Sequence, residues 1–105
     1  MADLGQTPMS ETAFYILLSL TRPMHGYGII KHVTQITAGR IVLGAGTVYG
    51  TLKKLQKAAL IRLVEAEDGR KIYQATPQGR QQLQAERERL AEMLRNAEVL
   101  DNEKV

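Results

Sequence analysis

The residues whose types and spacing best suit binding chemistry lie between positions 47 and 57. Three of them can make short hydrogen bonds: Thr47, Tyr49 and Thr51. Three others carry positive charge: Lys53, Lys54 and Lys57. Hydroxyl groups can hydrogen-bond to base edges and a threonine methyl can touch a thymine methyl, whereas lysines neutralise phosphates without reading sequence. This mixture in one short segment indicates nucleic-acid binding.

The same sequence offers little for catalysis or metal binding. It has no cysteine and only two histidines, His25 and His32, which are too few to build a zinc site. We find no serine, histidine and acid pattern and no carboxylate pair in an apolar setting. Gly44-Ala45-Gly46 is not followed by the lysine of a phosphate-binding loop. We therefore expect no enzyme, no cofactor and no metal.

Charge is distributed unevenly along the 105 residues, whose net charge is +3. Residues 44–76 hold six basic and three acidic groups, whereas residues 77–105 hold five basic and six acidic groups. A local positive excess is expected of a protein that contacts the phosphate backbone, although a solvated basic face would have the same composition.

The first half of the chain contains the patterns of two helices. Thr7-Pro8 supplies a capping hydroxyl and a proline for the first turn, and Arg22-Pro23 ends the apolar run that follows. A second helix is predicted to end near Ala38-Gly39, with Lys31 pointing away from an apolar stripe. That stripe consists of Ile29, Ile30, Val33 and Ile36.

A short strand and a third helix are expected next. Arg40 to Leu43 is β-branched and lies between glycines, which favours a strand. The third helix follows Gly44 and places Val48, Leu52, Leu55 and Ala59 on one face. Gly50, Lys53 and Lys57 fall on the opposite face and Lys54 flanks it, so only one side can be core. Lys57 lies too late in the helix for us to count it among the DNA contacts.

Two β-favouring runs, at residues 61–67 and 71–75, are separated by Asp68-Gly69-Arg70. The Asp-Gly pair readily supplies the positive φ angles of a tight hairpin. Thr76-Pro77 then opens a long charged helix with a narrow apolar seam. The seam consists of Leu83, Leu90, Met93, Leu94 and Ala97. Such a seam suits pairing with another helix, and the last residues, 101–105, are expected to fray.

The order helix, helix, short strand, helix, hairpin, long helix predicts a mainly α protein with a small β-wing, namely a winged helix-turn-helix followed by a C-terminal dimerisation helix. We divide the chain into a DNA-binding domain, residues 1–76, and a dimerisation helix with its tail, residues 77–105. No run approaches the roughly 18 apolar residues of a membrane span, and the first residues lack the pattern of a signal peptide. We expect a cytoplasmic protein without membrane contact.

Several motifs in this order resemble the PadR family of transcriptional regulators over roughly residues 12 to 80. The motifs are His25-Gly26-Tyr27 with Ile29, Gly46-Thr47-Val48-Tyr49, Leu52 with Leu55, Leu60-Ile61, Gly69-Arg70-Lys71-Ile72-Tyr73, and Thr76 with Gly79. The chain departs from the family pattern at two positions. Gly50 replaces a proline and Ala59 replaces a glycine. We take Ala59 to mean that the end of the third helix needs no left-handed residue there.

The third helix and its neighbours give the expected DNA contacts. Thr47, Tyr49, Gly50, Thr51, Lys53 and Lys54 belong to the reading helix, although Tyr49 could instead be an aromatic residue at the edge of the core. Tyr27 and Lys31 on the second helix can reach the DNA backbone, although Tyr27 also fits a core position. The resemblance implies wing contacts from Arg70 and Lys71, for which a solvated loop is the alternative.

The resemblance further implies a homodimer formed by the C-terminal helix with help from Phe14 of the first helix. Two-fold symmetry then predicts a pseudo-palindromic operator in double-stranded DNA. Such regulators are mostly repressors released by a small effector, for which Phe14 and Tyr15 are pocket candidates. The alternative function is a winged-helix adaptor that binds a partner protein through the seam and does not bind DNA.

Overall fold

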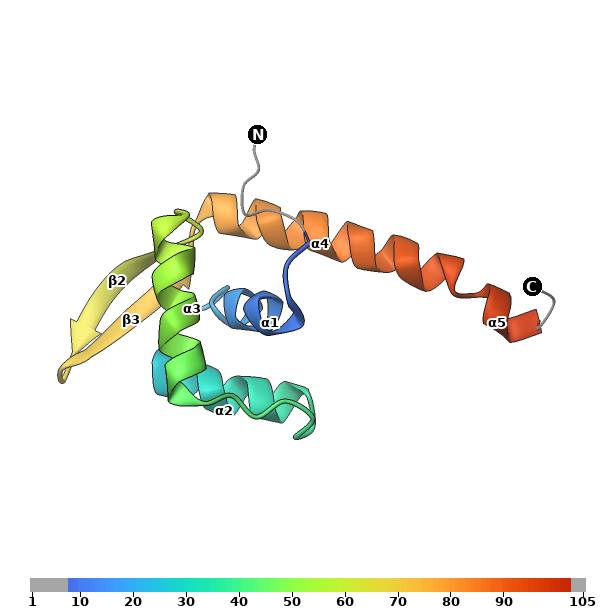
Figure 1. The fold of residues 1–105 in the computed structure, drawn as a ribbon. Coiled ribbons are helices and arrows are strands. Elements are labelled where there is room, and N and C mark those ends of the chain that lie inside the picture. Colours follow the sequence, from blue (N-terminus) through green and yellow to red (C-terminus); the bar gives the residue numbers. More distant parts are fainter. Residues whose placement is uncertain (1–7, 103–105) are drawn as a thin grey trace.

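The computed structural model describes residues 8–102, which form a helical body with a wing on one side and a projecting helix on the other (Figure 1). The elements in chain order are α1 (Glu11–Ser19), β1 (Met24–His25), α2 (Gly26–Ile36), α3 (Ala45–Lys57), β2 (Ile61–Glu67), β3 (Arg70–Ala75), α4 (Pro77–Asn96) and α5 (Val99–Asn102). This arrangement confirms the predicted winged helix-turn-helix with a long C-terminal helix.

The core lies where α1, α2 and α3 meet beneath the start of α4. Its fully buried apolar side chains include Ile16, Leu17, Leu20, Ile29, Val33 and Val48. Each such side chain stabilises the fold by roughly 1.5–3 kcal/mol through removal from water. Leu83 of α4 is also buried in this cluster. The first turns of α4 are therefore part of the body, and only the rest of the helix projects.

A polar contact joins α1 to α2 inside the body. The buried Ser19 hydroxyl donates to the carbonyl of Tyr15 at 2.8 Å, so its one proton is already used. Ser19 Oγ also lies 2.8 Å from His32 Nδ1 and must accept a hydrogen bond from the N–H at that nitrogen. One ring nitrogen of His32 is thus committed to structure.

The three strands form an antiparallel sheet in the order β1-β3-β2. Ile61 pairs with Ala75 and Glu67 with Arg70, and the register is irregular between Leu63 and Glu65. The hairpin turn has φ of 50° at Asp68 and 76° at Gly69, as the Asp-Gly pair predicted. The wing is therefore a hairpin with one edge covered by the short strand β1.

The strand predicted at residues 40–43 is wrong. That segment is a loop, and the short strand is Met24–His25, which pairs with Ile72 and Tyr73 of β3. Since β1 and β2 occupy both edges of β3, the 40–43 segment cannot pair with β3. Arg40 instead pairs with Glu11, and Leu43 is buried in the core. The β-branched residues of the 40–43 segment favour a strand, but tertiary contacts override this preference.

Several predicted helix ends also shift. α1 is capped by Ser10, whose hydroxyl accepts the amide of Ala13, and Pro8 precedes the helix; Thr7 lies outside the described residues. α1 ends at Ser19 and α2 at Ile36, each a few residues before its predicted stop. At the C-terminus, residues 101 and 102, which we expected to fray, belong to the short helix α5, and residues 103–105 lie outside the described part.

A tight joint connects the end of α3 to the start of α4. Thr76 caps α4 as predicted: its hydroxyl accepts the amide of Gly79 at 3.0 Å and donates to the carbonyl of Ala59 at 2.8 Å. A Cβ atom at Gly79 would collide with the carbonyl of Leu60, so only glycine fits there. Ala59 has φ of 63°, which overturns our expectation that this position needs no left-handed residue.

Ala59→Gly should raise the free energy of unfolding by about 1 kcal/mol, because alanine is disfavoured in the left-handed region and glycine is not. Urea unfolding measures this difference. The matched control is Ala58→Gly, where φ is −83° and glycine should bring no gain. A lower stability for Ala59→Gly than for the unchanged protein would contradict the assignment of strain to Ala59.

Candidate nucleic-acid interface

The third helix presents two faces of opposite character, as its sequence pattern predicted. Val48, Leu52 and Leu55 are buried against the body, whereas Ala59, predicted on the same face, lies beyond the end of α3 and is exposed. The outward residues Thr47, Gly50, Lys53 and Lys54 are exposed, and Thr51 is half-buried. No other residue lies within 4 Å of where a Cβ of Gly50 would be, so its backbone is open to close approach. The outward face thus combines hydroxyls, an open backbone and two ammonium groups.

The cations of this face are not neutralised by neighbouring carboxylates. Within residues 8–102 the ion pairs are Arg40 with Glu11 and Arg89 with Glu86, both away from the outward face of α3. The hydrogen bond and charge of Arg40 lower the pKa of the Glu11 carboxyl. Arg40 is therefore used to tie the loop before α3 to α1. The side chains of Lys53 and Lys54 are exposed to solvent.

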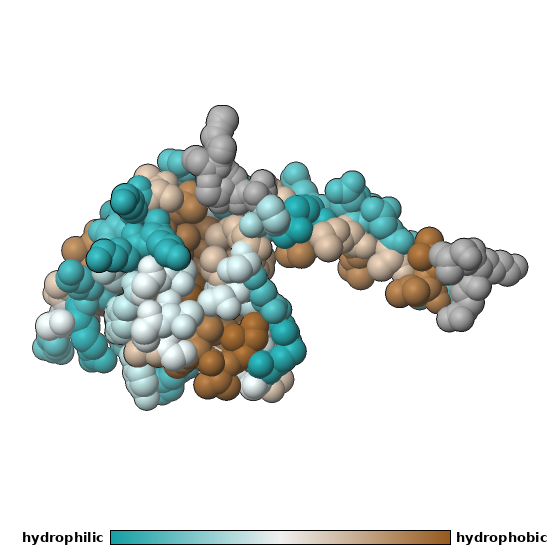
Figure 2. All heavy atoms as spheres, viewed as in Figure 1, coloured by the Kyte–Doolittle hydropathy of each residue, from teal (hydrophilic) through white to brown (hydrophobic). Residues whose placement is uncertain are grey.

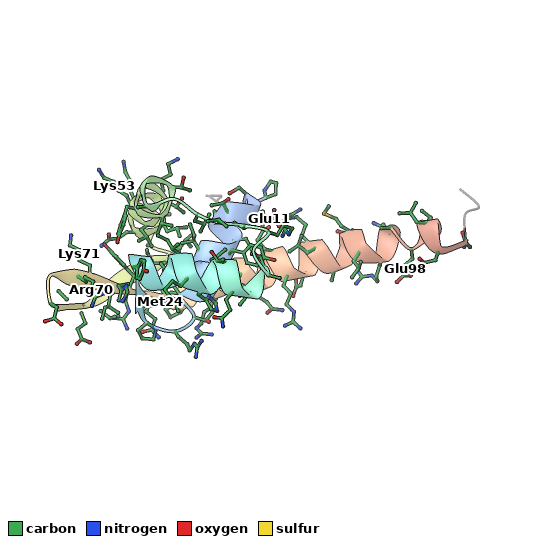
Figure 3. All side chains as sticks on the ribbon, turned by 90° about the horizontal axis from the view of Figure 1, so that it is seen from below. Glu11, Met24, Lys53, Arg70, Lys71 and Glu98 are labelled. Carbon is green, nitrogen blue, oxygen red and sulfur yellow. The ribbon has the colours of Figure 1, made fainter. Side chains whose placement is uncertain are left out.

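Arg70 and Lys71 add positive charge next to the turn of the wing hairpin. Both side chains are exposed at the start of β3. Figure 3 shows Lys53, Lys71 and Arg70 at the same end of the molecule, far from Glu98 of the projecting helix. The wing also carries the exposed acidic residues Glu65 and Asp68. The structure therefore brings the predicted wing cations and the α3 lysines to one end of the molecule.

Tyr27 and Lys31 lie on the solvent side of α2. Tyr27 is exposed, which excludes the core position that its sequence also allowed. The Lys31 ammonium lies 5.5 Å from the centre of the Tyr27 ring, in a cation–π contact. The Tyr27 ring is nearly parallel to that of His25, with 6.4 Å between centroids. These three side chains form a row along the start of α2.

Tyr49 is exposed but rests on another helix. It has 53% of its surface accessible, so it is not a core residue. Its ring nevertheless lies directly over Gly26, where a Cβ atom would come within 2.6 Å of the ring and its hydroxyl. Sequence reasoning missed the role of Gly26, although the His25-Gly26-Tyr27 motif pointed to the position. The missing side chain of Gly26 makes room for Tyr49.

The predicted interface residues of the C-terminal helix divide into two groups. Leu90, Met93 and Leu94 are 42%, 54% and 72% exposed, and Ala97 is exposed as well. Leu83 instead serves the core of its own chain. Phe14 is half-buried and lines pockets between α1 and α4. Figure 2 shows apolar residues along the side of α4 and α5 that faces α1.

Two further parts of this surface were missed by sequence reasoning. Val99 and Leu100 of α5 extend the exposed apolar residues. Glu86 is only 1% exposed, its Oε1 accepts two hydrogen bonds from Arg89, and its Oε2 has no partner among the described residues. Glu86 lies three residues after Leu83 and four before Leu90, a spacing that puts it on the seam face.

The described part of the chain contains no helix that could span a membrane and no group of three metal-binding side chains.

Comparison with known proteins identifies the family. The model of the transcriptional regulator PadR-like family matches residues 15–85. The chain belongs to this family. The matched range covers α2, α3 and the wing, together with parts of α1 and α4.

Among curated relatives, the transcriptional regulator YqjI of Escherichia coli is 39% identical over 81 residues, which are 76% of this chain and 39% of that protein. An uncharacterized protein of a Streptomyces fradiae transposon is 34% identical over 71 residues, which are 68% of this chain and 20% of that protein. The chain thus spans about two-fifths or less of the length of these relatives.

Solved structures of PadR-like proteins share the fold. A PadR family transcriptional regulator from Eggerthella lenta superposes with a TM-score of 0.74 at 22% identity, covering 85% of this chain and 80% of that one. Bacillus subtilis PadR, solved in complex with operator DNA, has a TM-score of 0.66 at 25% identity and covers 74% of this chain and 47% of that one. These likenesses confirm the winged-helix architecture.

Proposed function

We propose that this PadR-like protein is a dimeric, sequence-specific DNA-binding regulator that places α3 in the major groove. The observation that carries the proposal is the two-sided character of α3, with a buried apolar face and an outward face whose lysines have no ion-pair partner among the described residues. The fold is that of Bacillus subtilis PadR, which has been solved with operator DNA. A helix of this kind fits the width of the major groove.

The residues of α3 divide into two roles in this proposal. Thr47, Tyr49 and Thr51 meet base edges, because the first turns of a recognition helix lie deepest in the groove. Lys53 and Lys54 neutralise phosphates and contribute affinity without sequence preference. Gly50 allows the backbone of α3 to approach the DNA closely.

Contacts from α2 and the wing flank the groove. Tyr27 and Lys31 reach the backbone beside it, as the first helix of a helix-turn-helix does. Arg70 and Lys71 bind phosphates or enter the minor groove on the other side. A single continuous DNA-binding surface is supported by the position of Arg70, Lys71 and Lys53, which lie at the same end of the molecule (Figure 3).

Dimerisation is assigned to the projecting part of α4. Leu90, Met93, Leu94 and Ala97 form the seam, with Phe14 at its inner end. The exposed apolar surface on this helix supports the assignment, since a charged helix with one apolar seam gains stability by pairing. We accordingly assign residues 1–76 to DNA binding and residues 77–105 to dimerisation. A two-fold dimer calls for a pseudo-palindromic operator with half-sites about 10 base pairs, or a multiple of that, apart.

We assign the protein a repressor role in the cytoplasm, with release by a small molecule and without catalysis. Two pockets between α1 and α4 support an effector site, with volumes of about 390 and 360 Å³. Phe14 lines both of them, and Tyr15 lines the second. An effector in either pocket would shift α4 against α1 and change the spacing of the two reading helices in the dimer.

The double change Lys53→Ala, Lys54→Ala should weaken operator binding about tenfold or more and lower the slope of log affinity against log salt by about 2. Fluorescence anisotropy with a labelled duplex across a salt series measures both quantities. The stability should hold because both side chains are exposed. Lys57→Ala is the matched control and should leave affinity unchanged. Wild-type affinity in the double variant would remove these lysines from the interface.

Leu90→Glu should convert the dimer to monomers and abolish operator binding, because it places a charge in the middle of the apolar seam. Sedimentation velocity measures the oligomeric state. Ala85→Glu adds the same charge at an exposed position on the opposite side of α4 and should leave the dimer intact. A dimer that persists in Leu90→Glu would show that the interface lies elsewhere.

A further inference from the structure

The hydrogen bond that His25 makes to the backbone determines which of its ring nitrogens carries the proton. It caps α2, and its Nδ1 accepts the backbone N–H of Gly28 at 3.1 Å. In a neutral imidazole only one nitrogen can accept a hydrogen bond, so the proton must reside on Nε2. The parallel ring of Tyr27 stacks beside it. The outer edge of His25 is therefore an N–H donor.

The Nε2–H donor of His25 faces a second hydrogen-bond donor, on Arg70. His25 Nε2 lies 3.4 Å from Nη1 of Arg70 on the wing, and a guanidinium has no acceptor. Neither group can satisfy the other while Nδ1 holds Gly28. The opposite tautomer would leave the shorter contact to the Gly28 amide unmade. The described side chains also place no carboxylate within ion-pair distance of Arg70. Two donors thus converge on one point, and none of the described side chains places an acceptor between them.

The surroundings of this pair favour an anion. A hollow of about 280 Å³ is bounded by His25, Arg70, Lys71, Tyr49 and Tyr73, together with Gly69 at the hairpin turn. It lies between the start of α2, the outward face of α3 and the wing. The Lys71 ammonium adds a second positive charge to its wall. A phosphate group has several acceptor oxygens and can accept from both His25 and Arg70 at once.

We propose that His25 and Arg70 together bind one phosphate of the DNA backbone, at the junction of α2 and the wing. This rests on the proposed function, since it supposes that α3 enters the groove. His25 then has two tasks: its Nδ1 holds the start of α2, and its Nε2 fixes the position of the wing on the DNA. The contact carries no sequence information and sets the register of α3 in the groove.

The test is His25→Asn, because asparagine is a good helix cap but its shorter side chain cannot present a donor at the position of Nε2. At pH 8, where histidine is ordinarily neutral, this variant should bind both operator and unrelated duplex about tenfold more weakly. The salt slope should stay unchanged because no charge is removed. Arg70→Gln should weaken binding and also lower the slope by about 1.

The double variant His25→Asn, Arg70→Gln distinguishes a shared phosphate from two separate ones. With a shared phosphate, the loss in the double variant is smaller than the product of the two single losses. If the affinity loss in the double variant equals the product of the two single losses, the proposal is wrong. Wild-type duplex affinity in His25→Asn would also overturn it. This holds even if the His25 ring signals of the unchanged protein respond to millimolar inorganic phosphate.

Two controls distinguish a wrong assignment of His25 from a loss of stability or a wrong proposed function. The thermal midpoint of His25→Asn should match that of the unchanged protein, whereas His25→Ala, which removes the cap, should be lower. If the unchanged protein bound no duplex at all, the proposed function would fail. If it bound normally and His25→Asn bound equally well, only the assignment of His25 would fail.

Discussion

The close approach of the first turn of α4 to the end of α3 is the contact on which the rest of the arrangement depends. Gly79 lies against the carbonyl of Leu60, where a side chain of any size would force the two helices apart. The Thr76 hydroxyl bonds to both sides of this joint. Ala59 adopts a left-handed backbone to complete the turn, at a cost of about 1 kcal/mol that these contacts offset. The directions of α3 and of the projecting helix are therefore set together.

The proposed DNA surface is assembled from three elements that hold one another in place. Tyr49 of α3 rests on the bare backbone of Gly26, at the start of α2. The two residues before Gly26 form β1 and pair with β3 of the wing. A displacement of α4 by an effector would act on α3 through the joint at Leu60, and on the wing through β3, which leads directly into α4. In our proposal this is how one small movement reaches all of the DNA contacts.

Several features encoded by local sequence were predicted correctly. Thr76-Pro77, Asp68-Gly69 and the apolar period of α3 each depend on residues a few positions apart, so the sequence alone reveals them. The cap of α1 was a local error, since it is Ser10 and not Thr7. The larger errors arose where a distant partner decides the outcome. β1 forms because β3 offers it an edge, and Ala59 is strained because Thr76 and Gly79 require the turn. Leu83 has the spacing of the seam but lies where α4 still covers the core, and Glu86 is buried where α4 meets α1. The outward face of α3 could be predicted, whereas the support of Tyr49 by Gly26 and the facing donors of His25 and Arg70 could not, because both depend on the tertiary arrangement.

The central claim, that this surface binds a specific DNA sequence, is tested most directly by the affinity of the unchanged protein for the DNA upstream of its own gene. A mobility-shift titration against an unrelated duplex, repeated across a salt series, provides the measurement. If the surface binds DNA as proposed, we expect a complex specific to the upstream DNA whose affinity falls steeply as salt rises. No complex with either duplex, even at low salt, would contradict it and would favour a winged-helix adaptor that binds a partner protein.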